Sequence, residues 1–182
     1  MAYVIDRNNI QIKAEVLKNW LPSRAMKVAP TTLVLHSTAG HSALSSISWL
    51  KKIKYSYHYI IEDNGLVYKC VPTSRIAYHA GISEGPNGSN VNNYSFGISF
   101  ANMDNGEPYY PQQVQACYGT CVQLIRAFPS IKWITTHYQI SPGRKKDPNT
   151  FDFKGFAKVI QETTGVMPWK DYNLGVVRGH IL

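Results

Sequence analysis

The sequence predicts an α/β fold, in which a single domain has a central mixed β-sheet flanked by α-helices. The chain has 182 residues, of which 44% are hydrophobic, so it can form one domain with a substantial core. Short β-branched runs alternate with segments of helical periodicity, which is typical of a sheet covered by helices. The pair Asn64-Gly65 separates two β-rich runs and indicates an antiparallel hairpin in the same sheet.

The first third of the chain predicts a helix, a strand and a second helix. Residues 9–21 have the pattern of a short helix. A compact apolar run follows Pro30 and ends at His36, as expected of a buried strand. Ser42 then stands where it can cap a helix whose apolar side chains fall on roughly one side.

The middle third predicts the hairpin, a further strand and a long helix. Residues 55–71 form the hairpin, with Asn64-Gly65 as a two-residue turn. Residues 92–102 predict another strand. The long helix follows over residues 108–128, with Pro111 near its start, where the missing N–H of proline costs no helical hydrogen bond.

The last third predicts a strand and a closing helix. Residues 130–137 form the strand, which ends at His137. Residues 151–165 form the helix, and Gly165 suits the position just past its end. The predicted organisation is an N-terminal extension with a short helix (1–29), a main domain (30–165) and a C-terminal tail without a clear period (166–182).

The balance of charge is strongly basic. Lysine and arginine total 19 against 11 acidic residues, which gives a net charge of +8. This charge suits an anionic partner, whether nucleic acid, a lipid headgroup or an acidic wall polymer. The basic residues are scattered, and the chain lacks RNP, zinc-finger and helix-turn-helix signatures, so we expect no nucleic acid partner. No apolar run approaches the roughly 18 residues of a membrane span.

The three cysteines are Cys70, Cys117 and Cys121. An odd number, in a chain whose first residues lack the pattern of a signal peptide, argues against a disulfide framework. Cys117 and Cys121 are four residues apart in the predicted long helix and share one face of it. They are either half of a metal site or, as buried cysteines more often are, small core residues.

Two histidines, His36 and His137, stand at the ends of predicted strands. Functional sites of α/β sheets gather at the carboxyl ends of strands. Two imidazoles and a carboxylate suit a catalytic zinc ion and leave its fourth position for water. Asp147, in the loop after His137, would supply the carboxylate. The alternative is a pair of histidines that only pack or form hydrogen bonds at the strand ends.

The basic loop before Asp147 adds a cation to this arrangement. Pro142-Gly143 permits a reversal after His137, which brings the following segment back over the strand end. If this segment is extended, Lys145 and Asp147 share one side and Lys146 faces away. We therefore expect Lys145 to work in the site, whereas Arg144 and Lys146 serve the surface.

Five segments of the chain occur in an order known from one enzyme family. They read LVLHST, SYHYIIEDNGLVYKCVP, AYHAG, NNYSFGISF and HYQISPGRKKDP. Over roughly residues 30–163, this order resembles the type-2 N-acetylmuramoyl-L-alanine amidases, which include phage lysozyme-amidases and are similar to animal peptidoglycan recognition proteins. The final segment is the most specific, because it combines a histidine, Pro-Gly-Arg-Lys and Asp-Pro in the family's order.

The resemblance implies an activity and a metal site. The activity is zinc-dependent hydrolysis of the amide between N-acetylmuramic acid and L-alanine of the peptidoglycan stem peptide, carried out by residues 30–165. By position, His36, His137 and Asp147 are the implied ligands of one Zn²⁺ ion per chain. Lys145 falls on the lysine that stabilises the transition state.

Four further positions follow from the resemblance or from the strand pattern. Tyr57 falls on the tyrosine that assists the attacking water in the phage and recognition-protein branches, or it is a hairpin aromatic that only packs. His79 lines the substrate groove or forms hydrogen bonds within its wall. His58 points to the other face from Tyr57 and is expected to pack in the core. Ser99 stands where some bacterial members carry a glutamate as general base, so the proton acceptor stays open.

The biological setting has several alternatives. We expect synthesis in the cytoplasm without a signal peptide, and a lytic, endolysin-like role on the cell wall. A cytosolic recycling enzyme for soluble muropeptides and a secreted antibacterial effector are the other settings. A non-catalytic peptidoglycan-binding module is the competing function, although the chain has all three candidate ligands. The expected partner is peptidoglycan or a muropeptide, and the sequence leaves the oligomeric state open.

Overall fold

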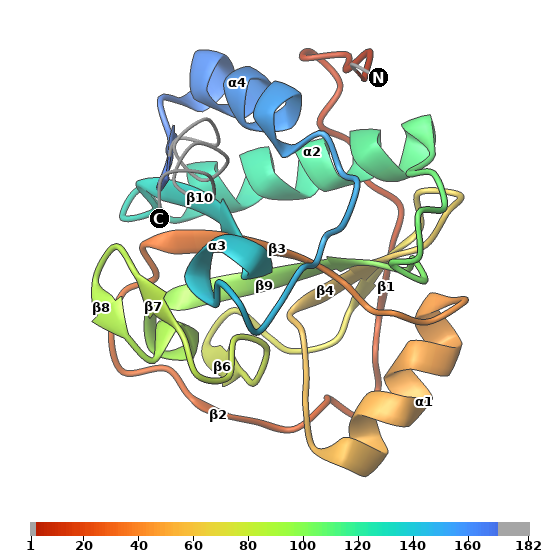
Figure 1. Ribbon diagram of the computed structural model, residues 1–182, viewed down its shortest axis with the longest axis vertical. Coiled ribbons are helices and arrows are strands. Elements are labelled where there is room, and N and C mark those ends of the chain that lie inside the picture. Colours follow the sequence, from red (N-terminus) through yellow and green to blue (C-terminus); the bar gives the residue numbers. More distant parts are fainter. Residues whose placement is uncertain (1–2, 171–182) are drawn as a thin grey trace.

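The computed structural model describes residues 3–170, and a seven-stranded mixed β-sheet forms its centre (Figure 1). In spatial order, the strands are β1 (Ala14–Val16), β5 (Val67–Lys69), β4 (Tyr59–Ile61), β9 (Ser95–Phe100), β3 (Thr32–Ser37), β10 (Trp133–Thr136) and β11 (Met167–Pro168). Neighbouring strands run parallel except in the hairpin of β4 and β5. The predicted mixed sheet is therefore confirmed.

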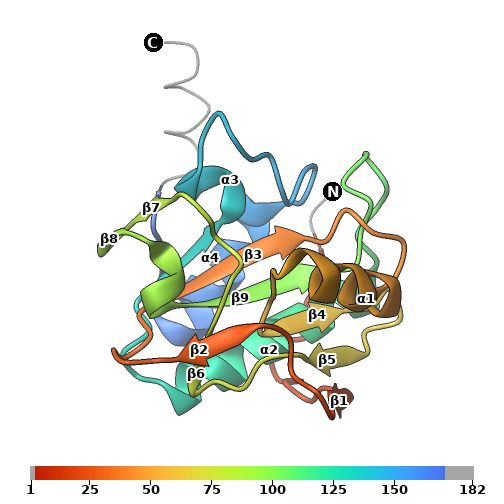
Figure 2. The ribbon, with the colours of Figure 1, turned by 90° about the horizontal axis from the view of Figure 1, so that it is seen from below.

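Helices cover both faces of this sheet. On one face lie α2 (Pro111–Ala127) and α4 (Phe153–Thr164), and on the other lies α1 (Ala43–Ile53) (Figures 1 and 2). Successive residues of a strand point to opposite faces. Ile61 of β4 therefore joins the core beneath α2, whereas its neighbour Ile60 joins the smaller core beneath α1. The predicted α/β architecture with flanking helices is confirmed.

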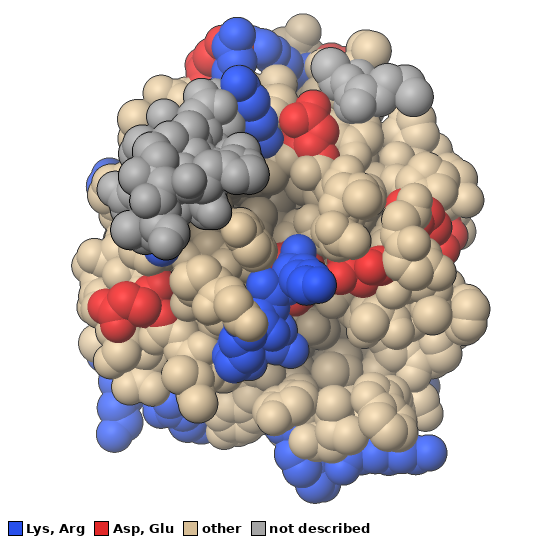
Figure 3. Space-filling model, in the orientation of Figure 1, with Lys and Arg blue, Asp and Glu red and all other residues tan. Residues whose placement is uncertain are grey.

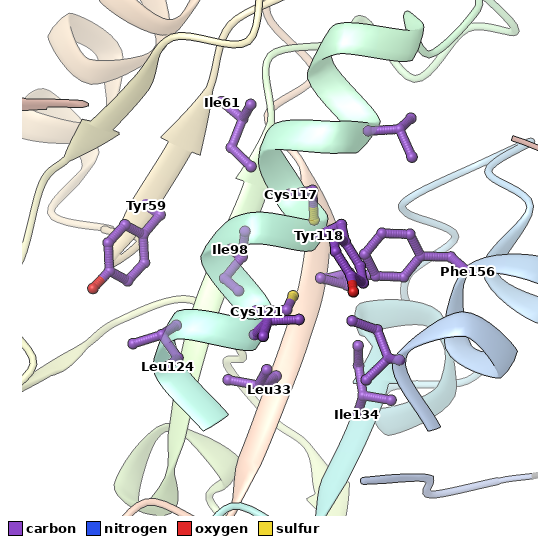
Figure 4. Packing of buried hydrophobic residues seen from close by; sticks show 14 of the residues in the cluster. Leu33, Tyr59, Ile61, Ile98, Cys117, Tyr118, Cys121, Leu124, Ile134 and Phe156 are labelled. Atoms are coloured by element: carbon purple, nitrogen blue, oxygen red, sulfur yellow. The ribbon is translucent and has the colours of Figure 1, made fainter. Parts of the chain in front are cut away.

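The larger core lies between the sheet, α2 and α4, and it contains two of the cysteines (Figure 4). Cys117 and Cys121 are fully buried there and carry free thiols. Cys70 is buried in the core beneath α1. None of the three belongs to a cluster that could hold a metal ion within residues 3–170. Their interpretation as core residues is confirmed, and half of a metal site at Cys117 and Cys121 is not formed.

Local sequence signals set the helix ends as predicted. The Ser42 hydroxyl accepts a hydrogen bond from the Ser45 N–H, and the Ser45 hydroxyl accepts one from the Ser42 N–H, which makes a reciprocal cap for α1. Pro111 is the first residue of α2. Gly165 follows α4 with a φ of 79°, a left-handed conformation that costs glycine little.

The predicted opening helix over residues 9–21 is wrong, because this segment is extended and contains β1. Ile10 and Ile12 pack against the larger core with the alternation of an extended chain. The Gln123 side chain on α2 donates to the Ile10 carbonyl at 2.8 Å. Gly119 makes room for this carbonyl, which would lie 2.9 Å from a Cβ at that position. These contacts with distant residues outweigh the local helix propensity.

The predicted hairpin is present, but its turn is longer than two residues. The Glu62 N–H donates to the Leu66 carbonyl at 2.9 Å, so Asp63, Asn64 and Gly65 lie in the loop. The Gly65 N–H donates to the Glu62 carbonyl at 2.9 Å, and Gly65 has a φ of 85°. This is the pattern of a turn followed by a glycine bulge, which takes one residue more than the predicted turn.

Two small antiparallel sheets complete the described fold. β2 (Ser23–Ala25) pairs with β6 (Arg75–Ala77), and β7 (Glu84–Gly85) pairs with β8 (Gly88–Ser89). The 3₁₀-helix η1 (Val91–Tyr94) leads into β9, and the short helix α3 (His137–Ile140) follows β10. Residues 1–29 thus contribute strands to two sheets, and residues 171–182 of the predicted tail lie outside the described range. Among the described helices, none has the length and hydropathy to cross a bilayer.

His58 packs in the interior, as predicted from its position in the strand. Its side chain is fully buried, its Nε2 donates to the Arg75 carbonyl at 2.9 Å, and its Nδ1 accepts from the Gly97 N–H at 3.1 Å. Burial lowers the pKa of His58 to about 4 from the ordinary 6.5. A proton on Nδ1 would break the bond with Gly97, so the folded chain keeps this ring neutral.

We predict that His58 makes the metal-free chain less stable in mild acid. As pH falls below 6.5 the unfolded chain takes up a proton at His58, whereas the folded chain resists until about pH 4. Between pH 7.5 and pH 5, this histidine should therefore remove about 2 kcal/mol from the free energy of unfolding. Urea unfolding at both pH values measures the loss. In His58→Asn, whose side-chain oxygen can still accept from Gly97, the loss should shrink by that amount. An unchanged loss would contradict the assignment.

Candidate metal centre and substrate groove

The candidate ligands meet at the carboxyl ends of two neighbouring parallel strands. His36 lies near the end of β3, and His137 follows β10, which pairs with β3 through Thr136 and Leu35. His137 Nδ1 lies 3.0 Å from one carboxylate oxygen of Asp147, and His36 Nδ1 lies 3.4 Å from the other. These three residues form the single cluster within residues 3–170 whose ligand atoms, all within 4.8 Å of one another, could hold a metal ion.

His137 does not end the strand, as the sequence predicted, but begins α3. Thr136 caps this helix: its hydroxyl accepts from the Gln139 N–H at 3.3 Å, and the Gln139 side-chain oxygen accepts from the Thr136 N–H at 3.1 Å. The sequence THYQ is the signal of such a reciprocal cap. The turn of the helix brings the buried His137 ring back over the strand ends.

The loop after α3 returns over the strand ends as the Pro-Gly pair predicts. The Asp147 carbonyl accepts from the Tyr138 N–H at 3.0 Å, which ties the third ligand to α3. Arg144 donates to the carbonyls of Ala80 and Ile82 at 2.9 and 2.8 Å. The expectation that Arg144 only serves the surface is therefore wrong, because its exposed side chain fastens this loop to the segment that follows β6.

The electrostatics of the cluster favour a bound cation. The pKa of His36 is lowered to about 4: burial is the largest cause, His137 and Lys145 add to it, and Asp147 opposes the change. Burial raises the pKa of Asp147, but the neighbouring His137 and His36 outweigh this and hold it well below its ordinary value. The buried imidazole of His36 is therefore neutral, and the carboxylate of Asp147 is ionised, near neutral pH.

The residues present fit a zinc ion. The Nδ1 atom of His36 is buried and has no hydrogen-bond partner, which is costly for a polar atom unless something else binds it. It faces the same point as His137 Nδ1 and the Asp147 carboxylate. Two imidazole nitrogens and one carboxylate oxygen are a ligand set of catalytic zinc sites.

Tyr57 lies beside the cluster, with its ring centre 5.0 Å from that of His36. Burial raises the pKa of the Tyr57 phenol, the charge of Asp147 adds to this, and the nearby Ser99 hydroxyl opposes it. Ser99 pairs with His36 in the register of β9 and β3, and its buried hydroxyl has no hydrogen-bond partner. The phenol is therefore a proton donor at neutral pH, and the Ser99 position holds no group that can take up a proton.

His79 borders the groove, but only 6% of its surface is exposed. Its Nδ1 lies 2.9 Å from Nε2 of His36, and its ring stands edge-on to that of His36. The sequence left two roles for His79 open, contact with substrate and hydrogen bonding within the groove wall. In the structure, its ring contacts His36. No local pattern predicts this contact, because His36 lies in β3 and His79 follows β6, 43 residues further along the chain.

Two members of the cluster, His137 and Asp147, line a cavity of about 690 Å³. One wall comes from α1 and the segments after it, and includes the exposed aromatic residues Trp49 and Tyr55. Another wall comes from the loop after α3 and includes Lys145, which is half-buried, and the exposed Lys146. Figure 3 shows lysine and arginine side chains gathered over this loop, next to acidic ones, at a hollow in this face. Lys145 thus borders the cavity as predicted.

Comparison with known proteins agrees with this geometry. The family described as N-acetylmuramoyl-L-alanine amidase matches residues 26–150. The 1,6-anhydro-N-acetylmuramyl-L-alanine amidase AmpD of Escherichia coli (strain K12) is 32% identical over 114 residues, which are 62% of this chain and 62% of that protein. N-acetylmuramoyl-L-alanine amidase AmiD of the same organism is 28% identical over 156 residues, 76% of this chain and 54% of that protein. The chain thus spans less than two thirds of these curated relatives.

Solved structures share the fold. AmiD from E. coli, in complex with the substrate anhydro-N-acetylmuramic acid-L-Ala-D-gamma-Glu-L-Lys, has a TM-score of 0.66 and 29% identity, covering 82% of this chain and 63% of that chain. The Ph2119 endolysin from a Thermus scotoductus bacteriophage has a TM-score of 0.64 and 20% identity, covering 81% of this chain and 98% of that chain, which is a likeness of fold.

The match of the family covers more than half of the chain and includes the whole candidate site. His36, His137 and Asp147 all fall within residues 26–150, as do Tyr57, His79 and Lys145. The sheet and its helices also agree with the structures of AmpD and AmiD. The chain belongs to the N-acetylmuramoyl-L-alanine amidase family.

Proposed function

We propose that this chain is a zinc-dependent N-acetylmuramoyl-L-alanine amidase. It hydrolyses the amide between N-acetylmuramic acid and L-alanine of the peptidoglycan stem peptide. The observation that carries the proposal is the meeting of His36, His137 and Asp147, two of which line a groove that Lys145 borders. A non-catalytic binding module needs the groove, but it has no need of three converging ligands and a cation beside them.

The residues divide the work of hydrolysis between them. Zinc, when bound by the three ligands, would supply a Lewis acid that lowers the pKa of water to about 7. Lys145 donates a hydrogen bond to the carbonyl oxygen of the substrate as negative charge develops there. Tyr57, whose phenol stays protonated, donates to the attacking water or relays a proton to the leaving amine. Ser99, unlike a glutamate, cannot act as the base, so the proton passes to solvent or is relayed through Tyr57.

We place this activity in a lytic, endolysin-like role on the cell wall. Trp49 and Tyr55, whose side chains are 60% and 58% exposed, border the groove and offer flat faces to the sugar rings of a glycan strand. The net charge of +8 attracts the protein to an anionic wall polymer. Recycling of soluble muropeptides is the second candidate, and the similarity to AmpD, a 1,6-anhydro-N-acetylmuramyl-L-alanine amidase, favours it.

The activity predicts that zinc-loaded protein releases amino termini of L-alanine from purified peptidoglycan. About one zinc ion per chain should be found by metal analysis, since one set of three ligands is present. The release of amino groups is followed by dansylation and mass spectrometry, with protein treated with a chelator as the control. Zinc-loaded protein that binds peptidoglycan without releasing L-alanine would be a recognition module instead.

The choice of setting follows from a comparison of two substrates. A lytic enzyme should hydrolyse intact sacculi at least as fast as soluble anhydromuropeptides, at equal concentrations of the amide bond. A recycling enzyme should act on the soluble substrate alone. The variants Trp49→Ala and Tyr55→Ala should slow the hydrolysis of sacculi more than that of anhydromuropeptides if these side chains hold a glycan strand.

A further inference from the structure

A buried row of hydrogen bonds leads away from His36 on the side opposite to the candidate metal. His36 Nε2 lies 2.9 Å from His79 Nδ1, and His79 Nε2 lies 3.1 Å from the Ser95 hydroxyl. The Ser95 hydroxyl lies 2.6 Å from the carbonyl oxygen of Val91. His36 and Ser95 are fully buried, and His79 nearly so. Water therefore does not compete for these bonds, and each needs a donor and an acceptor.

The position of each proton in this row follows from its last member. The Val91 carbonyl can only accept, so the single hydrogen of the Ser95 hydroxyl points to it. Ser95 must then accept from Nε2–H of His79. No hydrogen-bond partner of His79 carries a negative charge, so the buried ring is neutral and its Nδ1 has a lone pair. His36 must therefore donate from Nε2, which leaves the lone pair of a neutral imidazole on Nδ1.

The second histidine ligand, His137, forms its Nε2 hydrogen bond directly with a backbone carbonyl. His137 Nε2 lies 3.2 Å from the carbonyl oxygen of Ala80, which can only accept, so Nε2 carries the hydrogen. Nδ1 is therefore the nitrogen left for a metal, and it faces Asp147. Thus a carbonyl oxygen sets the position of the Nε2 proton in His137 directly. In His36, that position depends on the imidazole of His79, whose own proton position is set by Ser95.

The His79 ring is held in place from two sides. The Asn92 side-chain oxygen accepts from the backbone N–H groups of His79 and Ala80, at 3.0 and 2.8 Å. On the sheet side, the ring lies against Gly97 of β9, where an added Cβ would come within 2.5 Å of His79 Cγ. Ser95 and Gly97 are alternate residues of β9 and point to one face of the sheet, so one binds the ring and the other makes room for it.

We propose that His79 is a positioning residue, which together with Ser95 fixes His36 as the tautomer whose Nδ1 lone pair faces the zinc site. The inference rests on the proposed function for the identity of the ion, but the tautomer itself is a property of the metal-free chain. It assigns to His79 a role that does not require contact with substrate. Partners of this kind that orient a metal-binding histidine typically contribute 10–100-fold to the affinity for the metal.

The first test measures the imidazole nitrogens of the metal-free chain by ¹⁵N NMR near neutral pH. We expect His36 with its proton on Nε2, and His79 with its proton on Nε2. In Ser95→Ala, His79 loses the acceptor for that proton, and a fraction of His36 should shift to the other tautomer. A wild-type His36 with its proton on Nδ1 would overturn the proposal, whether or not the chain binds zinc or hydrolyses peptidoglycan.

The second test measures zinc affinity by competition with a chromophoric chelator. His79→Leu, which fills a similar volume without an acceptor, should weaken zinc binding by roughly 10–100-fold. His79→Gln can present its side-chain oxygen to His36 Nε2–H and should restore most of the loss. The matched control is His58→Asn, a neighbouring buried histidine without a hydrogen bond to His36, and it should keep the wild-type affinity.

The outcomes separate this inference from the proposed function. His79→Leu with wild-type zinc affinity would overturn the positioning role, and so would a loss that His79→Gln does not restore. Circular dichroism of each metal-free variant shows whether it folds; if His79→Leu does not, Ser95→Ala and the NMR of the wild type decide. A chain that binds zinc with the expected tautomer, but does not cleave peptidoglycan, would contradict the proposed function and leave the role of His79 intact.

Discussion

Replacement of Asp147 by alanine should abolish zinc binding and amide hydrolysis together. Asp147 is the one negatively charged ligand of the cluster, and its carboxylate lies 3.0 Å from His137 and 3.4 Å from His36. Without it, only two imidazole ligands remain, and no negative charge in the cluster offsets that of the cation. Because a catalytic zinc site needs three protein ligands to hold the ion and leave one position open, the activity should fall to the background of metal-free protein.

Metal analysis after dialysis against zinc, and the release of L-alanine amino termini from peptidoglycan, measure the two losses in Asp147→Ala. A suitable control is Asp104→Asn, because Asp104 borders the same cavity and accepts from the Asn149 N–H at 2.7 Å, which an amide oxygen can also do. This variant should keep about one zinc per chain. An Asp147→Ala protein that still binds zinc with wild-type affinity would exclude Asp147 as a ligand.

Replacement of Lys145 by alanine should preserve zinc binding and slow hydrolysis by about a hundredfold or more. Lys145 borders the cavity beside the three ligands, and its charge reaches His36 without making it a ligand. Its ammonium group can hold the negative charge that develops on the carbonyl oxygen, and loss of one such donor typically costs about 3 kcal/mol of transition-state stabilisation. The loss should appear in kcat more than in KM, since the charge exists only in the transition state.

The neighbouring Lys146 provides the matched control. Lys146→Ala removes the same charge from the same loop, but this lysine is exposed, so the rate should stay within a few-fold of the wild type. Zinc content and steady-state kinetics on a soluble muropeptide compare the two variants. Near-normal kcat in Lys145→Ala, or an equal loss in both variants, would remove the specific role of Lys145.

Short-range signals predicted most of the fold. The apolar run ending at His36, the cap at Ser42, the proline at the start of α2 and Gly165 at the end of α4 all act within a few residues, so sequence alone reveals them. The metal cluster was also predictable, because His36 and His137 stand at the ends of predicted strands and Asp147 lies in the loop after His137. The resemblance to the family added the proposed roles of Lys145 and Tyr57.

Three differences share one physical source, which is contact between residues far apart in the chain. The segment containing Ile10 is extended because it binds to α2 and pairs with β5. The local sequence pattern of the segment reveals neither contact. The sequence around Arg144 predicts a surface cation, because its hydrogen bond to the Ala80 carbonyl joins distant parts of the chain. The contact of His79 with His36 joins residues 43 apart in the sequence, and no spacing rule predicts it.

The close approach of His79 to Gly97 links the evolution of two positions. The imidazole of His79, from a different part of the chain, occupies the space that a side chain at residue 97 would need. A lineage that keeps this imidazole cannot accumulate even alanine at position 97 without displacing the ring, whereas a lineage that has lost it gains that freedom. Mutational drift at the two sites is therefore coupled, and the order of changes matters: the ring must leave before the methyl group arrives.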